Sequence, residues 1–308
     1  MDHRRSFFVL FIAGIALGGG SSDAHAQSRV FVSARSGSDS NTCNNINTPC
    51  QTFQGAVNQV AAAGTVIVLD TGGYGPVTIG KALTIDAPPG IVAFIHPPSG
   101  DAVSVAAGTT DTVVLRGLSL NVGTGNGINV TSAGTLQVQD CTIVGFSGAG
   151  LHFVSAGQLF VKDSTFSNNG GEGILVAPAS GTASSSIDRC RLEGNGGLST
   201  GALTAGASAT VTVRDSVASG NFRGFQAGTA AGQTVQLNVE NCVSTDNVVG
   251  LFAADGAGTV LRASDTVVTN NTLYGIEAQG SGSILSRSNN TVEGNAAAQT
   301  FSGPYTAR

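Results

Sequence analysis

The chain repeats itself at a nearly fixed interval, and this period restricts its possible folds more than any other feature. The segment DSVASGNFRGF at Asp215–Phe225 is followed 26 residues later by NCVSTDNVVGL at Asn241–Leu251. An earlier copy, RCRLEGN, begins at Arg189. Periods between 20 and 50 residues are typical of solenoids, propellers and other repeat folds. The chain is therefore expected to be built from stacked copies of one supersecondary unit.

Four columns of related residues run through the repeat. The first holds Asp or Asn in every unit except that of Arg189, and its members are Asp140, Asp163, Arg189, Asp215, Asn241, Asp265 and Asn289. The residue after each of these is mostly small: Cys141, Ser164, Cys190, Ser216, Cys242, Thr266 and Asn290. A third column is Asn except at Phe146, and contains Asn169, Asn195, Asn221, Asn247, Asn271 and Asn295. The fourth places Gly before an apolar residue: Gly127, Gly150, Gly173, Gly224, Gly250 and Gly275.

Between the columns lie short Val, Ile and Leu runs, so each unit holds three strand segments and three turns in about 24 residues. Units of this size stack as a parallel β-solenoid, in which each strand pairs with its equivalent one coil away. Asp and Asn tolerate a left-handed backbone and hydrogen-bond within turns, so their columns are interpreted as structural turn ladders. An antiparallel sandwich, the alternative, needs hairpin turns and would not keep the columns in register. We expect eight or nine coils between residues 65 and 300.

The first 26 residues have the features of an export signal. Arg4 and Arg5 precede the apolar run Phe7–Leu17, which is too short to span a bilayer. Ala24-His25-Ala26 supplies a small-residue cleavage site, and Gln27 would begin the mature chain. We expect a periplasmic or secreted protein without a membrane span after cleavage, and an uncleaved anchor is the alternative.

Residues 27–64 are expected to form an N-terminal segment with a strand at Arg29–Ala34, a polar loop and a helix at Gln51–Ala63. The helix would cover the open end of the solenoid, and residues 301–308 would form a tail at the other end. Export makes a disulfide between Cys43 and Cys50 plausible. The cysteines of the repeat share one inward column, and Cys141 and Cys190 lie two coils apart, so they are expected to be buried free thiols.

The composition limits the partners of the chain. Among 308 residues there are 44 Gly and only 11% charged residues, and the net charge is −5. The hydrophobic fraction of 41% is enough for a continuous core. A surface without a basic stripe is unsuited to binding nucleic acid, so no nucleic-acid partner is expected.

Three units, VQDCTI at 138–143, VRDSVA at 213–218 and VENCVS at 239–244, resemble the generic repeat of the right-handed parallel β-helix superfamily, which has the pectate lyase-like fold. A leading helix followed by Thr65–Leu69 and Gly73-Tyr74-Gly75 also resembles the start of that fold. The resemblance covers residues 51–300. It implies an all-β, right-handed, three-sheet parallel β-helix with a short N-terminal capping helix. The same repeat serves lyases, hydrolases, epimerases and adhesins, so the resemblance implies no single function.

The resemblance makes each Gly-apolar-x-apolar segment part of the first sheet. Its outward positions would be Ser104, Asn129, His152, Leu175, Gln226, Phe252 and Glu277, and the coil near Leu203 fits more than one register. Pectate lyases of this fold gather several carboxylates there to hold calcium, which needs 6 to 8 oxygen ligands. This row has one carboxylate. The Gly-His-Gly and Arg-x-Lys signatures of polygalacturonases and the Asp-Pro-His-Asp signature of alginate epimerases are absent. We expect no cofactor; calcium along the aspartates of the first column is the alternative.

Five residues of this row are candidate ligand contacts: Asn129, His152, Gln226, Phe252 and Glu277. His152, Glu172 and Arg223 are the weak candidates for catalysis, with His152 as a base; exposed polar residues are the alternative interpretation. Arg189, Arg191 and Glu193 are expected to form a surface salt-bridge cluster.

The leading hypothesis is an exported β-helix protein that binds polysaccharide or cell-surface glycan along the first sheet, without a recognisable catalytic site. A polysaccharide lyase or glycoside hydrolase with an unconventional site near His152 and Glu172 is the first alternative. A structural or adhesin-like surface protein is the second.

Overall fold

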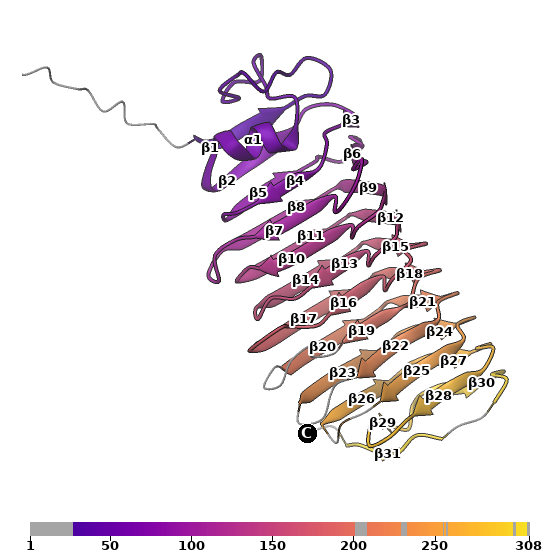
Figure 1. Ribbon diagram of the computed structural model, residues 1–308. Helices are drawn as coiled ribbons and strands as arrows, with labels where there is room; N and C mark the ends of the chain where they lie inside the picture. Colours follow the sequence, from indigo (N-terminus) through magenta and orange to yellow (C-terminus); the bar gives the residue numbers. More distant parts are fainter. Residues whose placement is uncertain are drawn as a thin grey trace, which may run out of the picture.

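The computed structural model describes residues 27–200, 208–228, 233–254, 256, 258–297 and 300–306. The chain winds into a stack of coils with its N-terminal part at one end and its C-terminal part at the other (Figure 1). Three parallel sheets run along the stack, and each coil passes through them in turn. The predicted parallel β-helix is therefore confirmed.

Sheet A contains twelve strands among the described residues. They are β1 (Gln27–Val32), β2 (Val60–Val68), β5 (Leu83–Asp86), β8 (Thr112–Arg116), β11 (Thr135–Gln139), β14 (Gln158–Lys162), β17 (Thr182–Asp188), β20 (Ser208–Arg214), β23 (Thr234–Glu240), β26 (Thr259–Ser264), β29 (Ser283–Ser286) and β31 (Gly303–Pro304). The part of the expected C-terminal tail that forms β31 thus extends this sheet, by pairing with β29.

Sheet B has ten strands in the described part of the chain. They are β3 (Gly72–Gly73), β6 (Ala93–Ile95), β9 (Leu118–Gly123), β12 (Thr142–Phe146), β15 (Thr165–Ser167), β18 (Arg191–Glu193), β21 (Val217–Ser219), β24 (Val243–Thr245), β27 (Val267–Thr269) and β30 (Thr291–Glu293).

Sheet C, which corresponds to the expected first sheet, has nine strands within the described ranges. They are β4 (Val77–Ile79), β7 (Val103–Ala106), β10 (Ile128–Ser132), β13 (Leu151–Phe153), β16 (Ile174–Val176), β19 (Leu198–Thr200), β22 (Arg223–Gly228), β25 (Val249–Ala254) and β28 (Tyr274–Ala278). Side chains alternate between the interior and the outside: Leu151 and Phe153 are fully buried, whereas His152 between them is half-buried and faces outward.

The turn between sheets A and B bends through a left-handed residue in each regular coil. Its members, with φ between 48° and 52°, are Asp140, Asp163, Arg189, Asp215, Asn241 and Asp265. The last coil departs from the expected column, because Ser288 rather than Asn289 has positive φ. Three residues separate Ala263 from Val267, but four separate their partners Ser286 and Thr291. The extra residue moves the bend by one position.

The third column forms a buried ladder of amides in the turn between sheets B and C. Each Asn side chain donates to the Oδ1 of the Asn one coil further on, at 2.8 to 3.4 Å. The same Oδ1 atoms accept backbone N–H groups of the preceding coil; Asn195 N, for example, lies 2.8 Å from Asn221 Oδ1. A second left-handed column, which the sequence reasoning missed, precedes this ladder: Gly145, Asn168, Gly194, Gly220, Asp246, Asn270 and Gly294.

The N-terminal helix is shorter than expected. Helix α1 spans Phe53–Gln59 and is capped by Thr52, whose side chain accepts the N–H of Gly55 at 3.0 Å. The predicted helix continued to Ala63, but Val60 is already extended and begins β2, which pairs with both β1 and β5. Val60 pairs with Gln27, Ala63 has a left-handed backbone (φ 59°), and the following β-branched residues from Thr65 pair with both β1 and β5. This pairing overrides the helical spacing of the preceding residues. Strand β1 likewise spans Gln27–Val32 instead of the expected 29–34.

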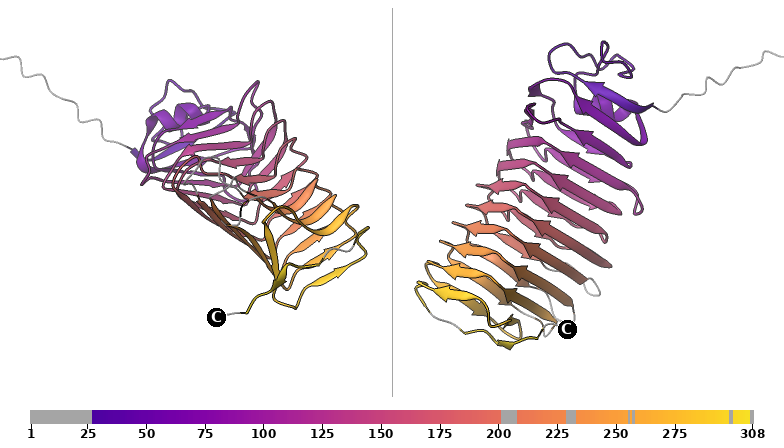
Figure 2. Two further views of the ribbon diagram at one scale, coloured as in Figure 1. Left: turned by 60° about the horizontal axis from the view of Figure 1, so that its bottom comes forward. Right: turned by 180° about the vertical axis from the view of Figure 1, so that it is seen from behind.

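The helix packs Phe53, Ala56 and Val57 into the N-terminal end of the core. Figure 2 shows α1 and β1 at the end of the stack opposite to the C-terminal coils. The Cys43–Cys50 disulfide closes the loop beside β1, as predicted.

Candidate functional site on the outer surface of sheet C

The outward row of sheet C has the register expected from the sequence. Paired positions place Thr78, Ser104, Asn129, His152, Leu175, Ser199, Gln226, Phe252 and Glu277 in one line. In the coil that fitted more than one register, the strand is β19, and Ser199 is the residue whose backbone pairs in register with Leu175 and Gln226. Leu203, near which the sequence left the register of this coil open, lies outside the described residues.

A polar cluster occupies the first part of this row. Asn129 donates to Asp101 Oδ2 at 2.9 Å, and the other oxygen of Asp101 accepts the backbone N–H of Asn126 at 2.7 Å. His152 stands beside Asn129 on the next strand. Asp101 was not among the contacts expected from the sequence. Like Glu172, it lies shortly before a strand of sheet C, and this position could have identified it as a candidate.

His152 is the most unusual side chain of the cluster. Its Nε2 is buried and has no hydrogen-bond partner among the described residues. Burial lowers the pKa of His152 below its ordinary value, and the carboxylates of Glu172 and Asp101 oppose this shift. The imidazole is therefore neutral at pH 7, with one nitrogen able to donate or accept a hydrogen bond.

A second group lies further along the row and is already internally paired. The Arg223 guanidinium lies 3.6 Å from the centroid of the Phe252 ring and donates to Gln226 Oε1 at 3.0 Å. Phe252 is only 2% exposed and packs with Val249 and Ala254. Phe252 was expected to be an outward ligand contact; it does lie in the outward row, but it is covered in this structure and presents no surface to a ligand.

Glu277 ends the row and accepts a hydrogen bond from Gln279 at 2.6 Å. No ion pair joins Arg223 to Glu172 or Glu277 among the described residues, although both carboxylates favour the charged guanidinium. The structure thus brings Asn129, His152 and Glu172 into one region, and places Gln226, Phe252 and Glu277 with Arg223 in another.

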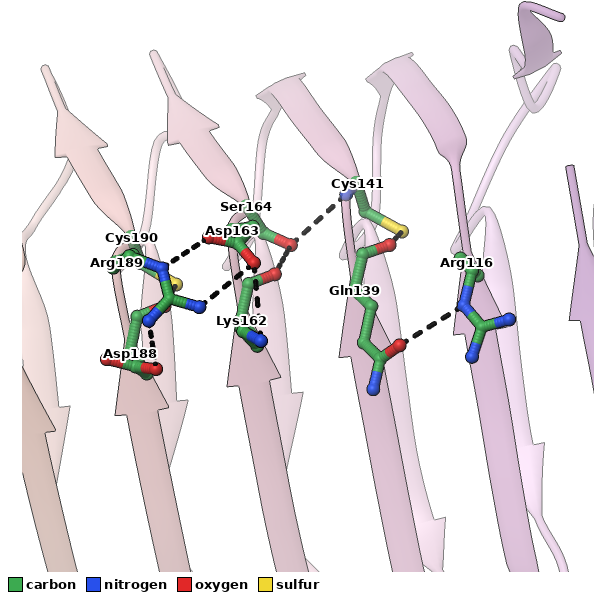
Figure 3. A network of polar contacts seen from close by, with 9 residues as sticks. All are labelled: Arg116, Gln139, Cys141, Lys162, Asp163, Ser164, Asp188, Arg189 and Cys190. Atoms are coloured by element: carbon green, nitrogen blue, oxygen red, sulfur yellow. Dashed lines mark hydrogen bonds and ion pairs between the residues drawn. The ribbon is translucent and has the colours of Figure 1, made fainter. Parts of the chain in front are cut away.

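The charged residues of the turn between sheets A and B pair with one another (Figure 3). Arg189 donates to Asp163 and Asp188, each at 2.8 Å, and Lys162 lies 3.8 Å from Asp163. Arg191 pairs with Glu193. Hydrogen bonding from Arg189 lowers the pKa of Asp163. Within the described ranges, no group of three or more His, Cys, Asp or Glu residues could hold a metal ion.

These observations define a right-handed parallel β-solenoid with a polar row along one sheet. The chain belongs to the right-handed β-helix family, whose model, "Right handed beta helix region", matches residues 102–297.

Two solved structures share the fold at low sequence identity. Pectate lyase Pel9A is 14% identical, with a TM-score of 0.64 over 92% of this chain and 80% of that chain. A rhamnogalacturonan lyase is 13% identical, with a TM-score of 0.57 over 89% of each chain. A search of the curated proteins finds no match. No helix in the described part of the chain is long and apolar enough to cross a membrane.

Proposed function

We propose that this protein is exported and binds a polysaccharide along the outer surface of sheet C, with Asp101, Asn129, His152 and Glu172 as the main contacts. The observation that carries the proposal is the placement of Asn129, which Asp101 holds in position, next to the outward, half-buried side chain of His152. Side chains that their neighbours already hold in place lose little freedom when they bind a sugar hydroxyl.

The arrangement suits an extended chain of sugars. Successive coils are about 4.8 Å apart, which is close to the length of one pyranose unit, so neighbouring sugars would meet neighbouring coils. Amide, imidazole and carboxylate groups hydrogen-bond hydroxyl groups. The carboxylates of Asp101 and Glu172 favour a neutral over an acidic polysaccharide.

Export is part of the proposal. The charged start, apolar run and Ala24-His25-Ala26 site support it, and these residues lie outside the described part of the chain. The Cys43–Cys50 disulfide also supports an oxidising compartment, either the periplasm or the exterior. The two solved neighbours of the fold are named as lyases of pectate and rhamnogalacturonan, which favours a polysaccharide ligand.

A glycan array followed by isothermal titration calorimetry tests the proposal. Asn129→Ala and His152→Ala are each expected to weaken binding about tenfold, because each removes a hydrogen bond from a desolvated site. Ser219→Ala, on the outward surface of sheet B, is the matched control and should leave the affinity unchanged. Absence of binding to every neutral and acidic glycan would reject the proposal.

The affinity for the polysaccharide should also fall as the pH is lowered. The pKa of His152 lies below its ordinary value of 6.5, so the neutral imidazole persists through pH 7 and 8. Lowering the pH through the folded-state pKa protonates the imidazole, which then has no acceptor nitrogen left for a ligand hydroxyl. Binding should therefore be constant above pH 7 and weaken below pH 6.5, and His152→Gln should abolish this dependence.

A lyase or hydrolase is the second candidate, because a neutral His152 near the Glu172 carboxylate could act as a base. Release of unsaturated or reducing ends from uronate-containing and neutral polysaccharides measures this activity. Activity that survives both His152→Ala and Glu172→Gln would exclude this site.

A further inference from the structure

The outer surface of sheet A contains a hollow of about 360 Å³, formed by three consecutive strands, β11, β14 and β17. Its lining residues are Gln137, Gln139, Phe160, Val161, Lys162, Ser186 and Asp188. A volume of this size falls within the range of small-molecule sites. None of these residues belongs to the polar row on sheet C.

The centre of the hollow is the Phe160 ring. Phe160 is 42% exposed, and its neighbours in register are Gln137 on one side and Ser186 on the other. Equivalent outward positions on the other regular strands are aliphatic, polar or charged: Val114, Thr212, Asn238 and Arg262. Packing and turn geometry thus do not require an aromatic residue at this position.

A second outward row runs beside Phe160 and consists of Gln139, Lys162 and Asp188. Figure 3 shows these three side chains on successive strands, with Arg116 continuing the row. Gln139 accepts from Arg116 Nε at 3.1 Å, and Asp188 accepts from Arg189 at 2.8 Å. Their neighbours therefore hold both groups in place before any ligand arrives.

Donors and acceptors also remain available in the hollow. Gln137 and Ser186 make no side-chain hydrogen bond to any residue that the structure describes, and the nearest carboxylate to Lys162 Nζ is Asp163 at 3.8 Å. The hollow thus combines an exposed aromatic ring with an amide, a hydroxyl, an ammonium and a carboxylate. All of them stand on paired strands, which keep their spacing rigid.

We infer that this hollow binds a neutral sugar residue of an oligosaccharide. The apolar C–H face of a pyranose stacks on the Phe160 ring. The hydroxyls of the sugar hydrogen-bond to the side chains of Gln137 and Ser186, which flank Phe160 on the neighbouring strands. Lys162 donates to a further hydroxyl and Asp188 accepts from another.

Other ligands fit this surface less well. Lys162, the cation that lines the hollow, lies next to Asp163 and Asp188, so an anionic polymer would gain little electrostatic attraction. A peptide cannot add as a strand here, because β14 is already paired on both sides. The inference is independent of binding on sheet C and goes beyond it.

Chemical-shift perturbation NMR of the isotope-labelled protein, titrated with cellohexaose, xylohexaose and mannohexaose, tests the inference, with a galacturonate hexamer as the acidic counterpart. At least one neutral hexasaccharide should shift the Phe160 ring and Gln137 amide resonances. Phe160→Ala should raise the Kd about tenfold through loss of the stacking surface. Phe222→Ala is the matched control, since Phe222 is an exposed ring (58%) in the turn before sheet C.

Two further variants separate the possible causes. Phe160→Leu keeps an apolar side chain and should still lose most of the affinity if stacking on an aromatic face is required. His152→Ala should leave the Phe160-dependent shifts unchanged, whether or not sheet C binds glycan. The inference is overturned if no neutral hexasaccharide shifts these resonances, if folded Phe160→Ala binds as tightly as the wild type, or if the galacturonate hexamer binds more tightly.

Discussion

Arg189 occupies a left-handed backbone position that its own chemistry does not favour. Its φ is 50°, and the equivalent residues of the other regular coils are Asp or Asn. Asn and Asp enter this region more readily than residues with long side chains. Arg189 remains there with ion pairs to Asp163 and Asp188, but all three side chains are partly exposed, so these pairs contribute little.

Arg189→Asn should therefore unfold at the same or a higher denaturant midpoint than the wild type, whereas Arg189→Ala should unfold at a lower one than Arg189→Asn. The Asn variant regains the backbone preference of the column, and the Ala variant loses the ion pairs without that gain. In 1 M salt the ion pairs of Arg189 are weaker. Urea titrations under this condition should therefore raise the denaturant midpoint of the Asn variant relative to that of the wild type. A stabilised Ala variant would contradict this account.

The cysteines of the repeat show how burial controls reactivity. Cys141, Cys190 and Cys242 are free and buried, and burial raises the pKa of each thiol to about 12. The thiolate is the reactive form, so these side chains are expected to be inert in the folded protein.

Ellman's reagent at pH 8 should label none of the three thiols in the native protein within an hour, and all three after unfolding in guanidinium. The disulfide-bonded Cys43 and Cys50 act as internal controls, since they remain unlabelled in both states without reductant. Rapid labelling of a native thiol would show that its coil opens on the timescale of minutes.

At the scale of structural elements, the amide ladder is the main polar component of the core. Asn221 is 2% exposed; its Nδ2 donates to Leu192 O at 2.9 Å and to Asn247 Oδ1 at 3.0 Å. Its Oδ1 accepts from the backbone and side chain of Asn195. One amide therefore bonds groups on the coils to both sides of its own.

Asn221→Ala should lower the free energy of unfolding by about 3 kcal/mol, because Asn195 N is left buried without its acceptor and Leu192 O and Asn247 Oδ1 each lose a buried donor. Asn295→Ala, at the partly exposed end of the ladder, is the comparison and should cost about 1 kcal/mol, since water can replace the lost bonds. Both are measured by urea denaturation. Equal losses at the two positions would indicate that the ladder contributes no more in the interior than at its end.

At the scale of the whole molecule, every coil contacts chiefly its two neighbours, as the consecutive strand orders of all three sheets show. Stability in such a stack is approximately a sum of coil terms and nearest-neighbour interfaces. A defect in the middle should therefore weaken the structure locally before it affects the ends. The ends are protected differently, by α1 and β1 at one side and by β31 on sheet A at the other.

Phe166→Ala should cost about 4 kcal/mol, because a fully buried ring in β15 leaves a cavity. Hydrogen exchange should accelerate most in β12 and β18, the strands that pair with β15. Amides of β1 and β2 should change little and provide the control. Uniform acceleration along the chain would show that the solenoid opens as one cooperative unit.

The sequence by itself determined the repeat, the three-sheet coil, the left-handed Asp and Asn turns, the outward row of sheet C and the buried free thiols. These properties depend on residues at fixed spacings within and between units, so a linear pattern records them. The end of α1 at Gln59 was decided by the extended Val60 and its pairing with Gln27 of β1, which helical spacing does not reveal.

Only the tertiary structure decided which outward residues are accessible. Phe252 and Phe160 both occupy outward positions, but Arg223 covers Phe252 while the Phe160 ring is left open between Gln137 and Ser186. Exposure depends on the side chains of adjacent coils, which lie more than twenty residues away and vary from unit to unit. The shared columns specify how each coil bends, and the variable positions, once stacked, determine what the surface can bind.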